Sequence, residues 1–315
     1  MSNGVDATAY LAPYPVRHVR RPVVLEISEH NYPVESSPKD SWLPIAFRAF
    51  EVIEQREAVR DLLILGTGSG LDALGAAEIF DLRSLTVTEL FAEGLDGARA
   101  NILAHLDRDV IDLAFCAGDL FEGVPAKTQF DLVYENLPNI PATPEIALEL
   151  GTNTGRFFDA TGLEVPEPYG DYLLTLHYLC LQAAWAHVRP GGGVLTAIGG
   201  RMANDVPFGL HRACGYEPEL AAFDVKYQAE PALVLPGYRK AEQERGVRFR
   251  FYDAEAIQVV ADARRPGLDG ATLADQVESA LERCSMTATE AEARDRAGHR
   301  VAHSVLMIVG RRPVE

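Results

Sequence analysis

The chain has 315 residues, of which 47% are hydrophobic and 24% are charged, and its net charge is −17. This length and composition allow one large domain or two small ones with a real core, and they exclude a mostly disordered protein. The acidic balance argues against nucleic acid and against an anionic membrane as partners, because both attract basic surfaces. The sequence has no apolar run long enough to span a bilayer and no signal-peptide pattern, so we expect a soluble, cytoplasmic protein.

The four cysteines are far apart in the sequence and form no C-x-x-C pair: Cys116, Cys180, Cys214 and Cys284. In a chain of this length, such spacing favours reduced, mostly buried thiols over a disulfide framework. No group of His and Cys residues has the spacing of a metal site. The sequence therefore predicts no metal cofactor.

The first 45 residues are rich in proline and aromatic residues, which predicts an irregular N-terminal arm or lid over residues 1–45 with a short strand near Val23–Ile27. A helix follows, capped by Ser41 and reaching about Ala58. We expect residues 46–315 to form one domain, with inserts at about 142–170 and 216–246.

From residue 61 onward, short apolar runs alternate with helical patterns. The predicted strands are 61–65, 85–89, 113–116, 130–134, 194–198, 247–252 and 303–310. The predicted helices are 71–80, 92–105, 171–188, 204–214 and 271–284. This alternation predicts an α/β fold: a Rossmann-like, seven-stranded, mostly parallel sheet with helices on both faces.

The most informative stretch is a glycine loop between the strand 61–65 and the helix 71–80: Gly66, Thr67, Gly68, Ser69 and Gly70. Glycines let the backbone turn tightly and approach a ligand closely, and the helix start that follows offers unpaired N–H groups. Such a loop is also a common turn, but its place between a strand and a helix indicates a binding site.

Glu89 lies nineteen residues beyond the last glycine of this loop, at the end of the next predicted strand. A carboxylate in that place can accept hydrogen bonds from both hydroxyls of a ribose. The loop and the acid together predict a ligand that contains a nucleoside.

These features resemble motifs of the class I S-adenosylmethionine (SAM)-dependent methyltransferases, from about Leu62 to Arg201, under half of the chain. The resemblance includes Ala-Gly-Asp-Leu at 117–120 and Arg-Pro-Gly-Gly-Gly at 189–193. It implies SAM as cofactor, bound by Gly66, Thr67, Gly68, Gly70, Glu89, Leu90, Asp119, Leu120 and Asn136. One position departs from the family: Ile64 stands where an acidic residue often precedes the first glycine, so another group must orient the loop or the methionine end.

The segment Tyr134-Glu-Asn-Leu-Pro-Asn-Ile-Pro follows the fourth predicted strand and resembles the Asn-Pro-Pro-Tyr loop of amino- and amide-methylating enzymes. In that family the Asn side chain and a backbone carbonyl hold the nucleophilic nitrogen, which implies Asn136 and Asn139 as the catalytic pair. Leu137 and Asn139 replace the first proline and the aromatic residue, which favours a small polar acceptor. A proline-stiffened turn with local Asn caps is the alternative.

Ile198-Gly-Gly-Arg201 resembles a Gly-Gly-Arg segment of methionine S-methyltransferases. This resemblance implies that Arg201 binds the carboxylate of an amino-acid-like substrate, together with Asn139 and Tyr172, although a structural arginine fits the segment equally well. The aromatic residues Tyr32, Trp42 and Tyr169 lie in segments that could cover the site.

The sequence thus predicts a SAM-dependent methyltransferase of a small amino-acid-like or secondary-metabolite acceptor, with that small molecule as its partner and a homodimer left open. The first alternative is a SAM-consuming cyclase on the same fold, which forms azetidine-2-carboxylate and methylthioadenosine. A SAM-binding regulator without activity and an NAD-dependent oxidoreductase are further alternatives. An obvious general base is not required, because methyl transfer needs one only for a protonated nucleophile.

Overall fold

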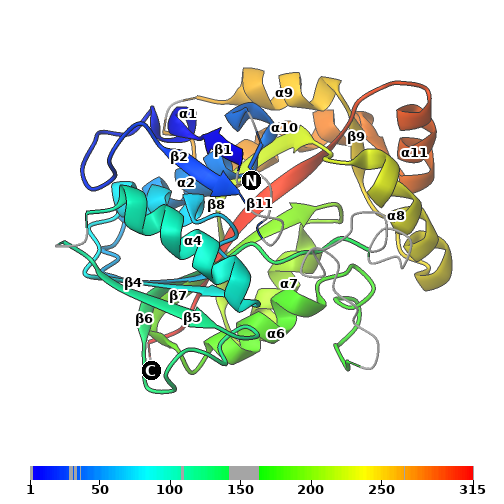
Figure 1. Cartoon of the computed structure of the whole chain (residues 1–315). Helices are drawn as coiled ribbons and strands as arrows, with labels where there is room; N and C mark the ends of the chain where they lie inside the picture. Colours follow the sequence, from blue (N-terminus) through cyan, green and yellow to red (C-terminus); the bar gives the residue numbers. More distant parts are fainter. Residues whose placement is uncertain are drawn as a thin grey trace.

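A nine-stranded sheet with helices on both faces forms the centre of the molecule in a computed structural model, which describes residues 3–27, 31, 34–35, 37–107, 110–141, 163–265 and 267–314 (Figure 1). The strands of this sheet are β3 (Asp61–Leu65), β4 (Ser84–Glu89), β5 (Asp112–Ala117), β6 (Phe130–Glu135), β7 (Val188–Gly200), β8 (Glu217–Tyr227), β9 (Phe251–Asp253), β10 (Ser285–Met286) and β11 (Val301–Arg311).

Five strands pair in parallel in the order β5-β4-β3-β6-β7, and β11 then pairs antiparallel with β7 and carries β8 on its other side. Ala302 pairs with Tyr227 of β8 and with Tyr252 of β9, so β9 continues the β7 side of β11. The predicted α/β class with a mostly parallel sheet is confirmed. The sheet has nine strands where seven were predicted, because β8 and the two-residue strand β10 were not recognised.

The helices are α1 (Thr8–Leu11), α2 (Leu43–Glu54), α3 (Leu71–Ile79), α4 (Ala92–His105), α6 (Thr175–Ala184), α7 (Asp205–Ala213), α8 (Pro231–Arg245), α9 (Glu255–Ala263), α10 (Gly270–Arg283) and α11 (Ala288–Arg296), with a 3₁₀ turn η1 (Pro38–Asp40). Near the N-terminus, β1 (Asn3–Asp6) and β2 (Val24–Ile27) form a separate two-stranded sheet. Ser41 lies before α2, where its Oγ accepts a hydrogen bond from the Leu43 N–H at 3.2 Å.

Two apolar layers cover the two faces of the sheet because side chains alternate along a strand. In β3, Leu62 and Ile64 pack in the layer of α2 and α3, whereas Leu63 and Leu65 pack in the layer of α6. All five residues of β3 are buried, as expected for a parallel strand that is covered on both faces.

A third apolar cluster joins α8 and α11 beside the start of β11. Val234, Leu235 and Tyr238 of α8 pack there against Phe249, which precedes β9. The range 216–246, expected as an insert, contains β8 of the main sheet and α8 of this cluster. Of the other expected insert, residues 142–162 lie outside the described residues.

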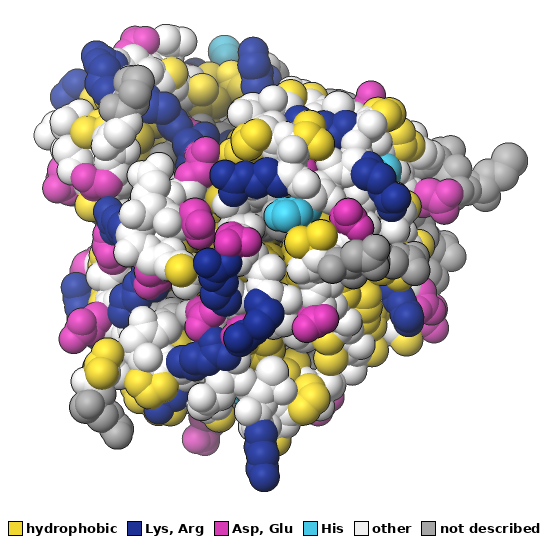
Figure 2. Space-filling view, turned by 90° about the vertical axis from the view of Figure 1, so that its left-hand side faces the viewer, with side chains coloured by type: hydrophobic (Ala, Val, Ile, Leu, Met, Phe, Trp, Pro, Cys, Tyr) yellow, Lys and Arg dark blue, Asp and Glu magenta, His cyan; other side chains and the backbone are white. Residues whose placement is uncertain are grey.

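Basic and acidic side chains intermingle on the face shown in Figure 2, so the net charge of −17 does not make this face uniformly acidic. Within the described ranges, no helix combines the length and the hydropathy that a membrane span requires.

Candidate functional site

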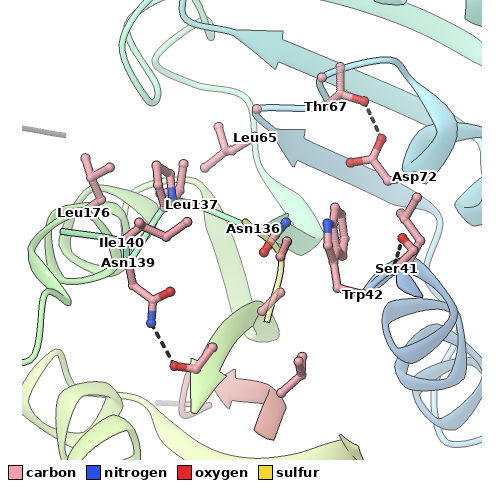
Figure 3. A pocket seen from close by; sticks show the side chains of 18 of the residues that line it. Ser41, Trp42, Leu65, Thr67, Asp72, Asn136, Leu137, Asn139, Ile140 and Leu176 are labelled. Carbon is pink, nitrogen blue, oxygen red and sulfur yellow. Dashed lines mark hydrogen bonds between the residues drawn. The ribbon is translucent and has the colours of Figure 1, made fainter. Parts of the chain in front are cut away.

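A cavity of about 350 Å³ opens where the parallel strands β3, β4 and β6 end. Ligands bind at this edge in open α/β sheets, because the carboxyl ends of the strands and the following loops meet there. The wall also includes the N-terminal arm, the end of β7, β8 and the start of α8. Figure 3 shows the Trp42 indole from the arm and the Asn136 amide side by side in this space.

The glycine loop turns around the end of β4. Gly66, Gly68 and Gly70 have φ of +67°, +59° and +87°, conformations that other residues rarely adopt. The N–H groups of Gly66 and Thr67 both donate to the Thr88 carbonyl, at 3.0 and 3.2 Å. Gly66, Thr67 and Gly68 line the cavity, whereas Gly70 does not, because it begins α3 and packs towards Ile102.

Two buried amides hold the loop from outside the cavity. Asn31 Nδ2 donates to the carbonyl of Gly68 at 2.8 Å, and Asn101 Nδ2 donates to the carbonyl of Ser69 at 3.0 Å. Neither residue is predicted by the sequence, because nothing in the local pattern links an Asn to a loop more than thirty positions away.

Glu89 lies at the end of β4 and lines the cavity, as the sequence predicts for a ribose-binding acid. Its Oε1 accepts a hydrogen bond from the Gly68 N–H at 2.9 Å, which fixes the carboxylate beside the glycine loop. Burial raises the pKa of Glu89, and backbone hydrogen bonds from Gly68 and Leu90 oppose that shift. A carboxylate held this way keeps acceptor capacity for a diol.

Asp72 is a second acid of the cavity wall, and the sequence analysis assigned it no role. Its carboxyl group is buried at the start of α3 and accepts hydrogen bonds from the Thr67 hydroxyl and the Ala73 N–H. Burial raises the pKa of Asp72 to about 7 against these hydrogen bonds, and the neighbouring Glu89 charge adds to the rise. Ile64, by contrast, is fully buried in the core, so Asp72 is the acid that this loop offers to a ligand.

Leu90, Asp119 and Leu120 line the outer part of the cavity. Leu90 is 43% exposed and Asp119 is exposed, so this end borders solvent. The loop after β5 is fixed to the end of β4, because the Gly118 N–H donates a hydrogen bond to the Glu89 carbonyl at 3.0 Å. The structure thus places these three predicted residues next to Glu89.

Asn136 and Asn139 both line the cavity, but their side chains lie differently (Figure 3). Asn139 is 7% exposed; its Nδ2 donates to the Gly199 carbonyl at 2.9 Å and its Oδ1 accepts from Arg201 at 3.5 Å. The Asn139 amide is therefore used to connect the loop to β7. Asn136 lies beside Trp42 and faces the cavity.

A buried pair supports the loop that carries Asn136. His177 Nδ1 and Glu135 Oε1 are 2.7 Å apart, and both side chains are fully buried. Glu135 Oε2 accepts from the Leu137 N–H at 2.8 Å, so α6 is connected through this pair to the loop after β6.

Arg201 follows β7 and is 4% exposed in the cavity wall. It donates from Nε to Gln228 at 2.9 Å, and its Nη2 lies 3.1 Å from His303 Nε2. Its guanidinium also stacks over the Tyr238 ring at 5.2 Å.

Tyr172, a predicted substrate-binding residue, does not line this cavity; its ring packs edge-on against Phe249 at 5.7 Å. Tyr169 packs on Tyr178 at 6.5 Å, again as part of the fold. Tyr32 lies outside the described residues. Among the described residues, no group of His, Cys, Asp or Glu side chains could hold a metal ion.

The chain is similar to two curated proteins, both called release factor glutamine methyltransferase. The protein from Deinococcus radiodurans is 30% identical over 187 residues, which are 58% of this chain and 60% of the relative. The protein from Koribacter versatilis is 27% identical over 156 residues, which are 48% of this chain and 50% of the relative. The predicted resemblance to class I methyltransferases is confirmed.

The chain spans 60% and 50% of the length of these two relatives. No protein family model matches the chain. Among solved structures, the N-methyltransferase NodS from Bradyrhizobium japonicum, in complex with S-adenosyl-L-homocysteine (SAH), is 12% identical with a TM-score of 0.39, covering 61% of this chain and 83% of that chain.

The predicted small-molecule partner is wrong by this comparison, because both relatives are named for a protein substrate, a release factor. The prediction depended on Leu137 and Asn139 replacing the proline and the aromatic residue of the Asn-Pro-Pro-Tyr loop. In the structure the Asn139 side chain is hydrogen-bonded to Gly199 and Arg201, so its presence does not indicate a small acceptor.

Proposed function

We propose that the protein is a SAM-dependent methyltransferase that modifies a side-chain amide of a protein. One observation carries the proposal: the glycine loop with its left-handed turns and the Glu89 carboxylate bonded to it form one wall of a cavity at the carboxyl ends of the parallel strands. The similarity to two release factor glutamine methyltransferases supports the amide as acceptor.

The described residues fit SAM. A cavity of about 350 Å³ is within the usual range of small-molecule pockets. Gly66 lines this cavity with φ of +67°, a backbone conformation that favours glycine and lets the chain turn close to a ligand. Glu89 would hold the ribose hydroxyls, and Leu90, Asp119 and Leu120 would border the adenine. Asp72 would face the cationic end in place of the acid missing at Ile64.

SAM supplies an electrophilic methyl group, and the protein's own residues must position the acceptor and exclude water. Asn136 would hold the acceptor amide by complementary hydrogen bonds, because an amide side chain both donates and accepts. Glu135 and His177 would keep the loop in place beneath it. Trp42 from the N-terminal arm covers the same space and limits access of solvent.

The test is transfer of a labelled methyl group from SAM to a purified peptide-chain release factor, with the modified residue located by mass spectrometry. We expect label on a glutamine and production of SAH only when the acceptor is present. Methylthioadenosine formed from SAM alone would replace the proposal with the cyclase reaction.

Calorimetry with SAH tests the cofactor site separately. We expect Glu89→Gln to raise the Kd for SAH by about ten-fold or more, since a hydrogen bond to a charged group contributes about 1.5–3 kcal/mol. An unchanged Kd, or no SAH binding by the native protein, would contradict the proposed cofactor site.

A further inference from the structure

Two cationic side chains lie in the cavity wall on the side away from Glu89. Lys226 near the end of β8 and Arg201 after β7 are 9% and 4% exposed, and both line the cavity. Cationic groups are rarely this deeply buried unless an anion compensates them, because removing charge from water is costly.

Strand register explains why the two cations lie together. Lys226 is the direct partner of His303 across β8 and β11, and Gly200, which precedes Arg201, pairs with Ser304 of β11. The neighbouring ends of β8, β11 and β7 therefore present Lys226, His303 and Arg201 in a row along one wall.

Three neutral side chains contact the Arg201 guanidinium: Gln228, Asn139 and His303. His303 Nδ1 lies 2.8 Å from the Ser304 carbonyl, to which it donates, so its Nε2 is an acceptor for Arg201. Burial and the charges of Arg201 and Lys226 lower the pKa of His303 well below its ordinary value. Gln228 accepts a hydrogen bond from Nε of Arg201, and Asn139 accepts one from its Nη1.

Lys226 has no such partner. Within the described ranges, neither a hydrogen bond nor an ion pair reaches its ammonium group, while Glu35 and Asp40 act on it only as more distant charges. Its nitrogen is a strong donor in a dry wall of the cavity, which is what a bound anion would require.

We propose that Lys226 and Arg201 form an anion subsite for a carboxylate of a molecule bound in the cavity, and that the protein acceptor supplies this carboxylate close to its methylated amide. The inference rests on the proposed function. A carboxylate fits the subsite because its oxygens can accept hydrogen bonds from the Lys226 ammonium, and the adjacent guanidinium of Arg201 adds positive charge.

The strand order favours the acceptor over the cofactor as the source. From β4, which carries Glu89, to β8, which carries Lys226, there are five strand-to-strand steps of about 4.8 Å. The strands that carry Glu89 and Lys226 are therefore about 24 Å apart, which is farther than the carboxylate of SAM lies from its ribose.

Calorimetry on the protein–SAH complex tests the subsite with three short probes: N-acetyl-alanyl-glutamine with a free carboxylate, its amidated form, and N-acetyl-glutaminyl-glutamate amide. We expect one of the two carboxylate peptides to bind about ten-fold or more tightly than the amidated one. Whichever of these two peptides binds more tightly shows whether the subsite recognises a C-terminal carboxylate or an acidic side chain. Lys226→Met should abolish the difference, Lys226→Arg should retain most of it, and the exposed Lys240→Met serves as the matched control.

A second arm compares SAH with its decarboxylated analogue S-adenosyl-3-thiopropylamine. If Lys226→Met weakens SAH and leaves the analogue unchanged, the subsite binds the cofactor's carboxylate and the acceptor assignment is overturned. If no probe shows a carboxylate preference that depends on Lys226 while SAH still binds, the subsite is overturned and the proposed function stands. Loss of SAH binding by the native protein would instead refute the proposed function.

Discussion

The two asparagines of the loop after β6 differ in what surrounds their side chains. The side-chain amide of Asn139 is hydrogen-bonded to Gly199 and Arg201, and its backbone carbonyl accepts a hydrogen bond from the Tyr238 hydroxyl at 2.8 Å. Asn136 faces the cavity beside Trp42. The sequence alone predicts that the two residues act as a pair. Their contacts indicate that Asn139 positions the loop, whereas Asn136 is available to bind the acceptor.

We therefore expect Asn136→Ala and Asn139→Ala to fail in different ways. Asn136→Ala should lower kcat by about 100-fold at an unchanged Kd for SAH, because only the positioned acceptor is affected. Asn139→Ala should cost about 1–3 kcal/mol of unfolding free energy, since buried partners lose their hydrogen bonds. Steady-state kinetics and urea unfolding of both variants test this, and equal loss of stability in the two would contradict it.

The buried Asp72 carboxyl group should make the folded protein less stable as the pH rises. Its pKa is raised by burial from 3.8 to about 7 in the folded protein. The folded state thus holds the proton more tightly than the unfolded state, and the stabilisation present below about pH 4 is lost as pH rises through about 7.

Urea unfolding at pH 5 and pH 8 should show this loss in the native protein and less of it in Asp72→Asn. We expect the difference between the two proteins to be about 2 kcal/mol, since one pKa unit corresponds to about 1.4 kcal/mol. Asn keeps an oxygen that can accept from Thr67 and Ala73, so the variant is expected to fold. Identical pH dependence in the two proteins would refute the assignment.

At the scale of elements, the start of α3 depends on the absence of a side chain at Gly70. A Cβ there would lie 2.8 Å from Ile102 Cγ1 and 3.2 Å from the Ala98 carbonyl of α4, and the residue has φ +87°. The packing of α3 against α4, and with it the cavity wall, requires glycine for two reasons at once.

Gly246 at the end of α8 separates these two reasons, because it has φ +69° and nothing near the place of a Cβ. Gly246→Ala should cost about 1–2 kcal/mol from the left-handed backbone alone. Gly70→Ala should cost about 1–3 kcal/mol more, because the new methyl group overpacks the helix contact. Unfolding free energies measure both, and equal costs would show that Ile102 and α4 simply move aside.

The elements that could be predicted from sequence are those whose local pattern decides their structure. The run Leu62–Leu65 is continuously apolar and buried on both faces, so β3 and the loop after it were found at their correct positions. β8 alternates less clearly, with charges at Asp224 and Lys226, and was missed because its pairing with β11 decides its state. α11 is short and mostly polar, so it depends on its packing on α8 and on the capping box that Thr287 and Glu290 form at its start.

The same distinction holds for the site. Glu89 could be proposed because it ends the predicted strand that follows the glycine loop, and Asn136 because its segment resembles the Asn-Pro-Pro-Tyr loop. Asn31 and Lys226 could not, because their relation to the cavity arises from contacts between distant parts of the chain. Asp72 was visible in the sequence, but its importance depends on burial beside Thr67.

At the scale of the whole molecule, the cavity is built from segments that span Val34 to Val305. The arm contributes Trp42, the glycine loop contributes Gly66, and α8 contributes Val234 at the opposite wall. A ligand that fills this space contacts all of these segments, so its binding should stabilise them together.

SAH at about 100 times its Kd should therefore raise the unfolding free energy by about 2.7 kcal/mol and the Tm by about 5 °C. Glu89→Gln at the same SAH concentration should show a smaller rise. Hydrogen exchange should slow in the arm around Trp42 as well as in the glycine loop, because both line one cavity. Slower exchange restricted to the glycine loop, with the arm unchanged, would mean that the arm does not close on the cofactor, and the water-excluding role given to Trp42 would have to be abandoned.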